Sequence, residues 1–508
     1  MNFERSAGIL LHPTSLPGTY GIGDLGPDAY RFVDLLEASG QKLWQVLSLG
    51  PTGYGDSPYQ CFSAFAGNHY LISIDALLKE QLLRPEDLDP IPAFDPVSID
   101  YGKVIEYKMP LLRKAFSCYE SQSKQALRHD LEKFERSNKE WLDNYALFMA
   151  LKEHHGGVNW SEWSREAVQR NRTALASYQK ELAREIAFHK FLQFLFFQQW
   201  KALKQYTNER GIKIIGDLPI FIAYDSADAW SNRHLFTIDK DGKLFAVAGV
   251  PPDYYSPTGQ LWGNPLYRWG EMEKDDYEWW RKRMTKLLEL VDIIRVDHFR
   301  GFDAYWEIPG NAPTAETGKW VRCPGKKFFT TLQKHLGELP IIAEDLGVIT
   351  KSVRALRDAF GFPGMKILQF AFGSTMDKQF LPHNYPRNCI VYTGSHDNDT
   401  TRAFFEKAKH DGSDNYAFVR RYLHYSGDDI RFELIRLAYA SVANMVIIPM
   451  QDILNLGNEA RMNFPGKAGG NWTWRFTWNQ VPEKTTETYR DLTVIYERPP
   501  KQIEETAT

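Results

Sequence analysis

The sequence predicts an α/β fold, a TIM (β/α)8 barrel with large, mostly helical subdomains inserted into its βα loops. Apolar, β-branched runs recur eight times with amphipathic segments between them, which is typical of parallel βαβ units. Acidic residues follow several of these runs, and the catalytic groups of such barrels lie at the carboxyl ends of strands. An open doubly wound sheet is the alternative, but no G-x-G-x-x-G follows the first run and no Walker A motif is present.

The expected strands and helices alternate along the chain. Strands are expected at residues 8–15, 42–47, 212–220, 292–297, 339–347, 365–370, 388–397 and 445–452. A helix is expected at 27–40, where proline stands near the start and glycine at the end. Further helices are expected at 182–208, 275–290, 350–360, 399–409 and 428–443.

We expect one catalytic barrel over residues 1–508 with two insertions. Residues 52–185, after the second strand, are largely charged and helical, and they predict an inserted, mostly helical subdomain. Residues 225–272, after the third strand, predict an inserted loop subdomain. Its segment 249–265 has too much Gly and Pro for regular structure and is typical of a long functional loop.

Composition excludes several classes of partner. The 61 Lys and Arg nearly balance the 64 Asp and Glu, without long blocks of one sign, so neither nucleic acid nor an anionic membrane surface is expected. No run approaches the ~20 apolar residues of a membrane span, and no signal pattern opens the chain. The four cysteines lack metal-ligand spacing and suit free thiols in the cytoplasm. A plastid targeting segment removed before the first residue would leave the same sequence.

The central motif is the run DIIRVDHFRG at residues 292–301. Because side chains alternate along a strand, Arg295 and Asp297 share a face. The guanidinium should lower the pKa of Asp297 and keep it ionised, as a nucleophile requires. The alternative is an ordinary ion pair at a strand end, and this run alone does not decide between the two.

Three acids stand at corresponding positions, Asp297 after the fourth strand, Glu344 after the fifth and Asp397 after the seventh. A retaining glycosidase uses one carboxylate to attack the anomeric carbon and a second that alternates between acid and base. A third can hold sugar hydroxyls as charge develops. We therefore expect Asp297 to be the nucleophile, Glu344, with no cation beside it in sequence, the acid/base, and Asp397 a hydrogen-bonding group.

A metal site on the turn that carries His396, Asp397 and Asp399 is the less favoured alternative, because the ligands are crowded and no distant partner cluster is evident. No metal or cofactor is expected. Aromatic residues in loops rich in Gly, Pro, Asp and Asn suit the apolar faces of sugar rings. They include Tyr54, Tyr59, Tyr254, Tyr255 and Trp262, for which interior packing is the alternative.

Several segments resemble those of a known family. The runs RVDHFRG at 295–301, AEDLG at 343–347 and TGSHDNDT at 393–400 resemble the signature segments of the amylomaltases or disproportionating enzymes. These are the 4-α-glucanotransferases of glycoside hydrolase family 77, in the α-amylase clan. The resemblance extends over residues 8–15, 56–60, 216–219, 251–255 and 463–466, and so covers nearly the whole chain.

The resemblance implies that α-1,4-glucans and maltooligosaccharides, as in starch and glycogen, are cut, held covalently on Asp297 and passed to the 4-hydroxyl of another glucan. It implies that the subsites are lined by Ser57, Tyr59, Asp217, Asp253, Tyr254, Gln260, Trp262, Arg295, His298, His396 and Asn463. A loop near 250–262 is expected to close over the acceptor. Tyr54 and Tyr101 resemble a secondary glucan-binding pair away from the cleft.

Two other functions stay open from the sequence. One is a retaining hydrolase of the same clan, which would only shorten maltotriose, whereas a transferase would also lengthen it. The other is a non-catalytic glucan-binding barrel, against which the complete acid trio argues. The oligomeric state, monomer or homodimer, is also left open.

Overall fold

Eight parallel strands of the described chain close into a barrel in the order β1-β12-β11-β10-β9-β6-β3-β2. The computed structural model describes residues 3–121, 125–252, 256–373, 377–427, 429–467 and 469–498. The strands are β1 (Ser6–Leu10), β2 (Leu43–Gln45), β3 (Lys213–Leu218), β6 (Ile293–Val296), β9 (Ile341–Ala343), β10 (Gly364–Ile367), β11 (Cys389–Tyr392) and β12 (Met445–Pro449). Their order around the barrel follows the chain, and pairing of β1 with β12 closes it. The predicted TIM barrel is confirmed.

All eight expected strands are present, and each ends earlier than expected. The apolar run that begins with β10 continues into the short helix α13 (Leu368–Ala371), and β12 continues into α17 (Met450–Ile453). A buried strand and a buried helical turn are both apolar on every side, so hydrophobicity alone does not separate them.

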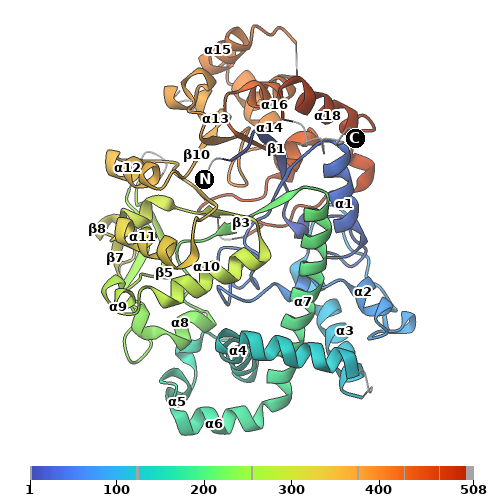
Figure 1. Cartoon of the computed structure of the whole chain (residues 1–508), viewed down its shortest axis with the longest axis vertical. Helices are drawn as coiled ribbons and strands as arrows, with labels where there is room; N and C mark the ends of the chain where they lie inside the picture. The colour runs from blue at the N-terminus through green and yellow to red at the C-terminus, as the bar shows by residue number, and fades with distance from the viewer. Residues whose placement is uncertain are drawn as a thin grey trace, which may run out of the picture.

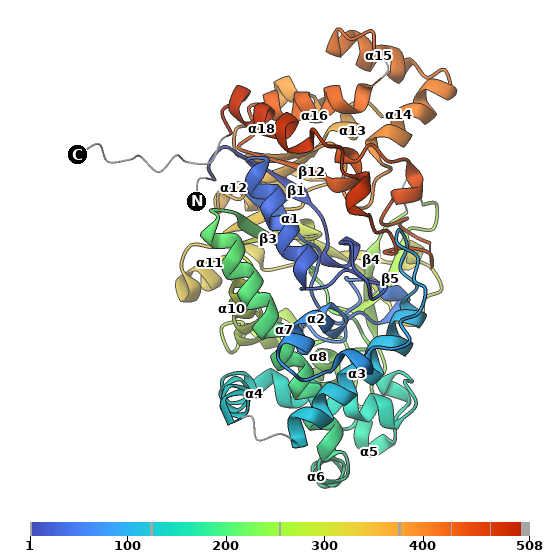
Figure 2. The ribbon, with the colours of Figure 1, turned by 90° about the vertical axis from the view of Figure 1, so that its right-hand side faces the viewer.

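The barrel helices lie outside the strands (Figure 1). They include α1 (Pro27–Ala38), α7 (Ala183–Glu209), α10 (Glu278–Leu290), α11 (Gly325–Leu336), α12 (Lys351–Ala359), α14 (Thr401–His410), α16 (Ile430–Ala440) and α18 (Thr485–Ile495). Helix α15 (Asp414–Leu423) packs on α14 and protrudes from the barrel (Figure 1 and Figure 2). Helices α1, α7, α10 and α11 follow one another around the barrel, and α18 packs between α16 and α1 (Figure 2). The six helices expected from the sequence are thus found, with ends shifted by a few residues.

The long connection from β2 to β3 gathers at one end of the molecule, far from α15 (Figure 1). It contains α2 (Ile74–Lys79), α3 (Tyr101–Ser121), α4 (Gln125–His154), α5 (Arg165–Val168) and α6 (Arg172–Glu181). The ring of Phe134 in α4 lies 5.9 Å from that of Phe194 and 5.4 Å from that of Phe197 in α7. Aromatic packing therefore joins this connection to the barrel helix. A subdomain bounded at 52 and 185 stays a proposal.

A second sheet lies outside the barrel, with strand order β5-β4-β7-β8. Its antiparallel strands are β4 (Ala246–Val250), β5 (Gln260–Pro265), β7 (Ala304–Pro309) and β8 (Lys319–Arg322), and the short helices α8 (Ala227–Ser231) and α9 (Trp269–Glu273) flank the first pair in sequence. The expectation that 249–265 lacks regular structure is wrong. Gly259 and Gly263 adopt left-handed φ of 68° and 76°, which glycine allows without strain, so the segment pairs as a hairpin despite its composition.

Within the described residues, no helix is long and apolar enough to cross a membrane.

Arg498 seals the seam where β1 meets β12. Its fully buried guanidinium donates hydrogen bonds of 2.9–3.2 Å to the carbonyl oxygens of Ser6, Tyr439, Ser441, Ala443 and Asn444. Replacing Arg498 with Ala should lower the free energy of unfolding by about 2 kcal/mol or more, because buried carbonyl groups lose their donors. Urea unfolding checks this.

The matched control is Arg490→Ala, which removes one exposed hydrogen bond to the Ala38 carbonyl oxygen. Its effect should stay within about 0.5 kcal/mol. Equal effects of the two substitutions would contradict the role given to Arg498.

Candidate active site

Asp297 and Glu344 stand side by side because of strand register. Val296 pairs with Ala343 between β6 and β9, so the residues that follow each strand lie next to each other at the mouth of the barrel. The Glu344 amide donates to the Val296 carbonyl at 3.0 Å, and the Asp297 amide donates to Leu218 at 3.0 Å. The two carboxyl groups expected from the sequence are therefore positioned by barrel backbone.

Arg295 connects two carboxylates of the mouth. It is the register partner of Asp217 on β3, and its Nη1 lies 2.7 Å from both carboxylate oxygens of Asp217 and 3.0 Å from Oδ1 of Asp297. The side chains of Arg295 and Asp217 are buried. The Tyr59 hydroxyl donates to Asp217 at 2.7 Å and lies 3.0 Å from Nε2 of His396. One network thus joins four of the predicted site residues to Asp297.

Burial outweighs Arg295 at the first carboxyl group. Loss of solvent raises the pKa of Asp297 to about 6, although the Arg295 guanidinium lowers it, and the Asp217 carboxylate raises it further. The sequence-based expectation of a lowered pKa is corrected here: the sequence displays the adjacent cation but neither the depth of burial nor the second anion.

Glu344 titrates higher than Asp297. Burial and the charge of Asp297 raise the pKa of Glu344 to about 7, against the effect of Arg295 and of two backbone amides. Those amides belong to His298, at 2.7 Å, and Leu346, at 2.9 Å. Of the two neighbouring carboxyl groups, Glu344 is the one that keeps its proton more readily near neutral pH.

Asp397 has the opposite electrostatic character. Burial favours its neutral form, but His396 and the Asn463 amide outweigh burial and hold the pKa of Asp397 below its usual range. Asn463 Nδ2 lies 2.7 Å from Oδ1 of Asp397, and His396 Nε2 lies 3.3 Å from Oδ2. The Asp397 carboxylate in turn raises the pKa of His396, although burial lowers it.

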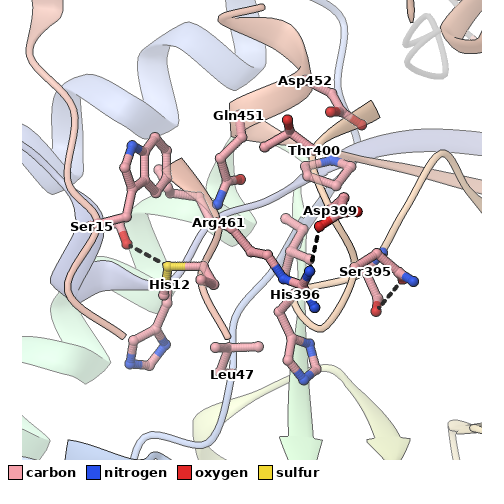
Figure 3. A pocket seen from close by; sticks show the side chains of 16 residues that line it. His12, Ser15, Leu47, Ser395, His396, Asp399, Thr400, Gln451, Asp452 and Arg461 are labelled. Carbon is pink, nitrogen blue, oxygen red and sulfur yellow. Dashed lines mark hydrogen bonds and ion pairs between the residues drawn. The ribbon is translucent and has the colours of Figure 1, made fainter. Parts of the chain in front are cut away.

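Arg461 holds the turn that carries Asp397. It donates to the Asp397 carbonyl at 2.6 Å and to the Asn463 carbonyl at 2.8 Å, and its third nitrogen pairs with Asp399. Figure 3 shows Arg461 and Asp399 beside His396, at a small pocket of about 30 Å³. Arg461 was not expected from the sequence, since it lies far along the chain from the acids and no local pattern marks it.

A cleft of about 750 Å³ opens at this mouth. Predicted residues that line it are Tyr54, Ser57, Tyr59, Gln260, Trp262, Asp297, His396, Asp397 and Asn463. Trp472 also lines it and was missed; its ring lies 5.8 Å from that of Tyr59 and 6.0 Å from that of His396. The cleft thus combines carboxylates with a cluster of aromatic rings.

His298 and Trp262 meet at the edge of the cleft. Their rings are perpendicular with centroids 4.9 Å apart, and the Trp262 indole donates to the Gln260 side chain at 3.1 Å. Burial lowers the pKa of His298 to about 3, so its ring is neutral at physiological pH. Asp253 and Tyr254, predicted for the same region, lie outside the described residues.

Tyr54 and Tyr101 differ in exposure. Tyr54 is 79% exposed and Tyr101 only 7% exposed, and the Tyr101 hydroxyl donates to the Trp472 carbonyl oxygen at 3.0 Å. The buried position of Tyr101 argues against direct contact between its ring and a glucan, because stacking requires an accessible face. Of the two residues predicted for a secondary glucan site, only Tyr54 therefore remains a candidate for direct contact with a glucan.

No group of three or more His, Cys, Asp or Glu side chains suited to a metal ion occurs among the described residues. Asp399 belongs to the turn considered above as an alternative metal site. Its carboxylate pairs with Arg461 and accepts a hydrogen bond of 2.9 Å from the side-chain amide of Asn458.

A barrel with neighbouring carboxyl groups of raised pKa at its mouth, beside an aromatic cleft, is typical of enzymes that act on glycosidic bonds. The family model described as 4-alpha-glucanotransferase, that of glycoside hydrolase family 77, matches residues 11–480. The chain belongs to this family.

Individual relatives agree with that assignment. The chain is 50% identical to a 4-alpha-glucanotransferase of Thermus thermophilus over 94% of this chain and 95% of the relative, and 47% identical to one of Synechocystis over 97% and 98%. Among solved structures, an amylomaltase from Streptococcus agalactiae in complex with acarbose superimposes with a TM-score of 0.94. The two sequences are 40% identical, and the superposition covers 98% of this chain and 100% of the amylomaltase.

Proposed function

We propose that the chain cuts α-1,4-glucans and transfers the released segment to the 4-hydroxyl of an acceptor glucan or glucose, with retention of anomeric configuration. The observation that carries this proposal is the pair Asp297 and Glu344, adjacent in register and with pKa values raised to about 6 and about 7. Family membership supports the reaction class.

In the first step, Asp297 attacks the anomeric carbon while Glu344 gives its proton to the departing glycosidic oxygen. The bond to that oxygen breaks as the bond to Asp297 forms, and the products are a shortened glucan and a covalent glycosyl carboxylate. The lower pKa of Asp297 supports its role as the ionised partner, and the higher pKa of Glu344 supports its role as the acid.

Asp397 holds sugar hydroxyl groups in this account. Its lowered pKa keeps it anionic, and a fixed carboxylate strengthens its hydrogen bonds as positive charge develops on the sugar ring. His396 and Asn463 orient it, and Arg461 holds both sides of the turn. The position of the Tyr59 ring, in the cleft beside His396 and Trp472, supports a role in stacking against a sugar ring.

In the second step, Glu344 accepts the proton of an acceptor hydroxyl, which attacks the anomeric carbon and releases Asp297. Transfer prevails when sugar occupies the acceptor site and water does not. Gln260 and Trp262 of β5 line the cleft on the side proposed for the acceptor, and Asp253 and Tyr254 are proposed to complete the cover.

The four cysteines are free thiols, which supports the cytoplasm as the location.

Incubation with maltotriose alone tests the proposed reaction. We expect glucose together with a ladder of longer maltooligosaccharides, measured by chromatography. Glucose and maltose without longer products would instead indicate a hydrolase, and no change would indicate a binding protein.

Asp297→Asn should lower the transfer rate on the order of 10³-fold or more, because the amide cannot act as nucleophile. The control Asp414→Asn changes an exposed acid at the start of α15 and should leave the rate unchanged. A variant at Asp297 with the parent rate of glucose release would contradict the assignment.

The pH dependence of kcat/KM should be bell-shaped. Activity should rise as Asp297 loses its proton near pH 6 and fall as Glu344 loses its proton above about pH 7. Initial rates on maltotriose from pH 4.5 to 9, with the melting temperature followed at each pH, check this prediction. Constant activity up to pH 9 in folded enzyme would be incompatible with Glu344 as the acid.

A further inference from the structure

The outer sheet presents a partly exposed tryptophan that none of the roles above uses. Trp320 on β8 is 40% exposed. Its register partner on β7 is Trp306, with ring centroids 5.2 Å apart and an interplanar angle of 65°. The guanidinium carbon of Arg300, a buried residue, lies 3.9 Å from the Trp320 ring centroid. Arg300 therefore covers one face of the indole, Trp306 packs against it at an angle, and part of Trp320 remains exposed.

Polar groups border this ring. Arg322 lies two residues further along β8 and so points to the same side of the sheet as Trp320. Its Nη1 lies 2.8 and 2.9 Å from the two carboxylate oxygens of Asp303, which also accepts a hydrogen bond of 2.8 Å from Ser352. A flat ring bordered by hydrogen-bonding groups suits a glucose unit, which has apolar C–H faces and a hydroxyl rim. The paired charges of Arg322 and Asp303 favour a neutral ligand.

This surface is connected to the catalytic mouth through Arg300. Arg300 lies two residues after His298, and the backbone amide of His298 donates a hydrogen bond to the Glu344 carboxylate. Its Nη1 donates at 2.6 Å to the carbonyl oxygen of Val348, four residues after Glu344. Ser352 belongs to α12, the helix that follows the Glu344 loop, and its hydroxyl oxygen also lies 3.4 Å from Nη1 of Arg322 on β8. Trp320 therefore stands next to the loop of the proposed acid/base.

The position of Glu344 decides which part of a glucan would reach Trp320. The acid/base must contact the glycosidic oxygen that leaves and later the acceptor hydroxyl that replaces it. The acceptor chain therefore extends from the catalytic centre on the Glu344 side of Asp297. We propose that Trp320, with Arg322 and Asp303, forms a remote acceptor subsite that stacks a glucose unit of a long α-1,4-glucan. This inference rests on the proposed function.

Acceptor length gives the test. With α-maltosyl fluoride as donor, the glycosyl enzyme forms without a glucan leaving group, so only the acceptor occupies this side of the cleft. In Trp320→Ala, the KM for maltoheptaose as acceptor should rise about three- to tenfold, the loss expected when one aromatic stacking contact is removed. The KM for glucose as acceptor and the kcat should stay within about twofold of the parent, and Trp320→Phe should recover most of the affinity.

Phe245→Ala is the matched control. Phe245 is 50% exposed, precedes β4 of the same sheet and carries Arg268 at 5.2 Å over its ring. The Phe245→Ala substitution should leave the KM values for glucose and for maltoheptaose unchanged. An unchanged KM for maltoheptaose in Trp320→Ala would overturn the subsite, and so would an equal rise for glucose and maltoheptaose, which would indicate a structural role. Failure of the parent enzyme to transfer to any acceptor would instead refute the proposed function.

Discussion

The contact of Arg295 with Asp217 and Asp297 is the interaction on which the site depends. A buried cation is costly unless it is paired, and removing one partner of such a set leaves an uncompensated charge. Here the cation is paired twice, with Asp217 on the neighbouring strand β3 and with Asp297, which directly follows the strand of Arg295. The pairing aligns two barrel strands and orients Asp297. The charge of Arg295 also opposes the increase in the Asp297 pKa that burial causes. Asp297 can therefore ionise near neutral pH while its neighbour Glu344 stays protonated.

The barrel and its insertions contribute differently to the site. The barrel supplies the acids at fixed backbone positions, through the hydrogen bonds that join β3, β6 and β9 at their carboxyl ends. The long connections supply the walls: Tyr59 comes from the β2 to β3 connection, Trp262 from β5, and Asn463 and Trp472 from the segment after α17. Rigid elements thus hold the reacting groups, and longer loops shape the space that a glucan fills.

The barrel and its acids could be predicted because both leave local patterns: buried runs repeat along the chain, and Asp297 and Glu344 each follow one directly. Other features depend on contacts between distant segments. Arg461 and Trp472 reach the site from beyond the last strand, and no neighbouring residue marks them. The outer sheet combines residues near 250 with residues near 310, so neither half shows a complete pattern. The rise in the Asp297 pKa and the burial of Tyr101 follow from tertiary packing, which local sequence does not encode.

The most direct test of the central claim is to trap the glycosyl enzyme. The Glu344→Gln variant is incubated with α-maltotriosyl fluoride, whose fluoride leaves without a proton from the acid, and the protein is then digested and analysed by mass spectrometry. Without its base the variant should release the sugar slowly. The account predicts a maltotriosyl group attached to Asp297. A label on Asp397 or another residue, or consumption of the donor without any covalent label, would contradict it.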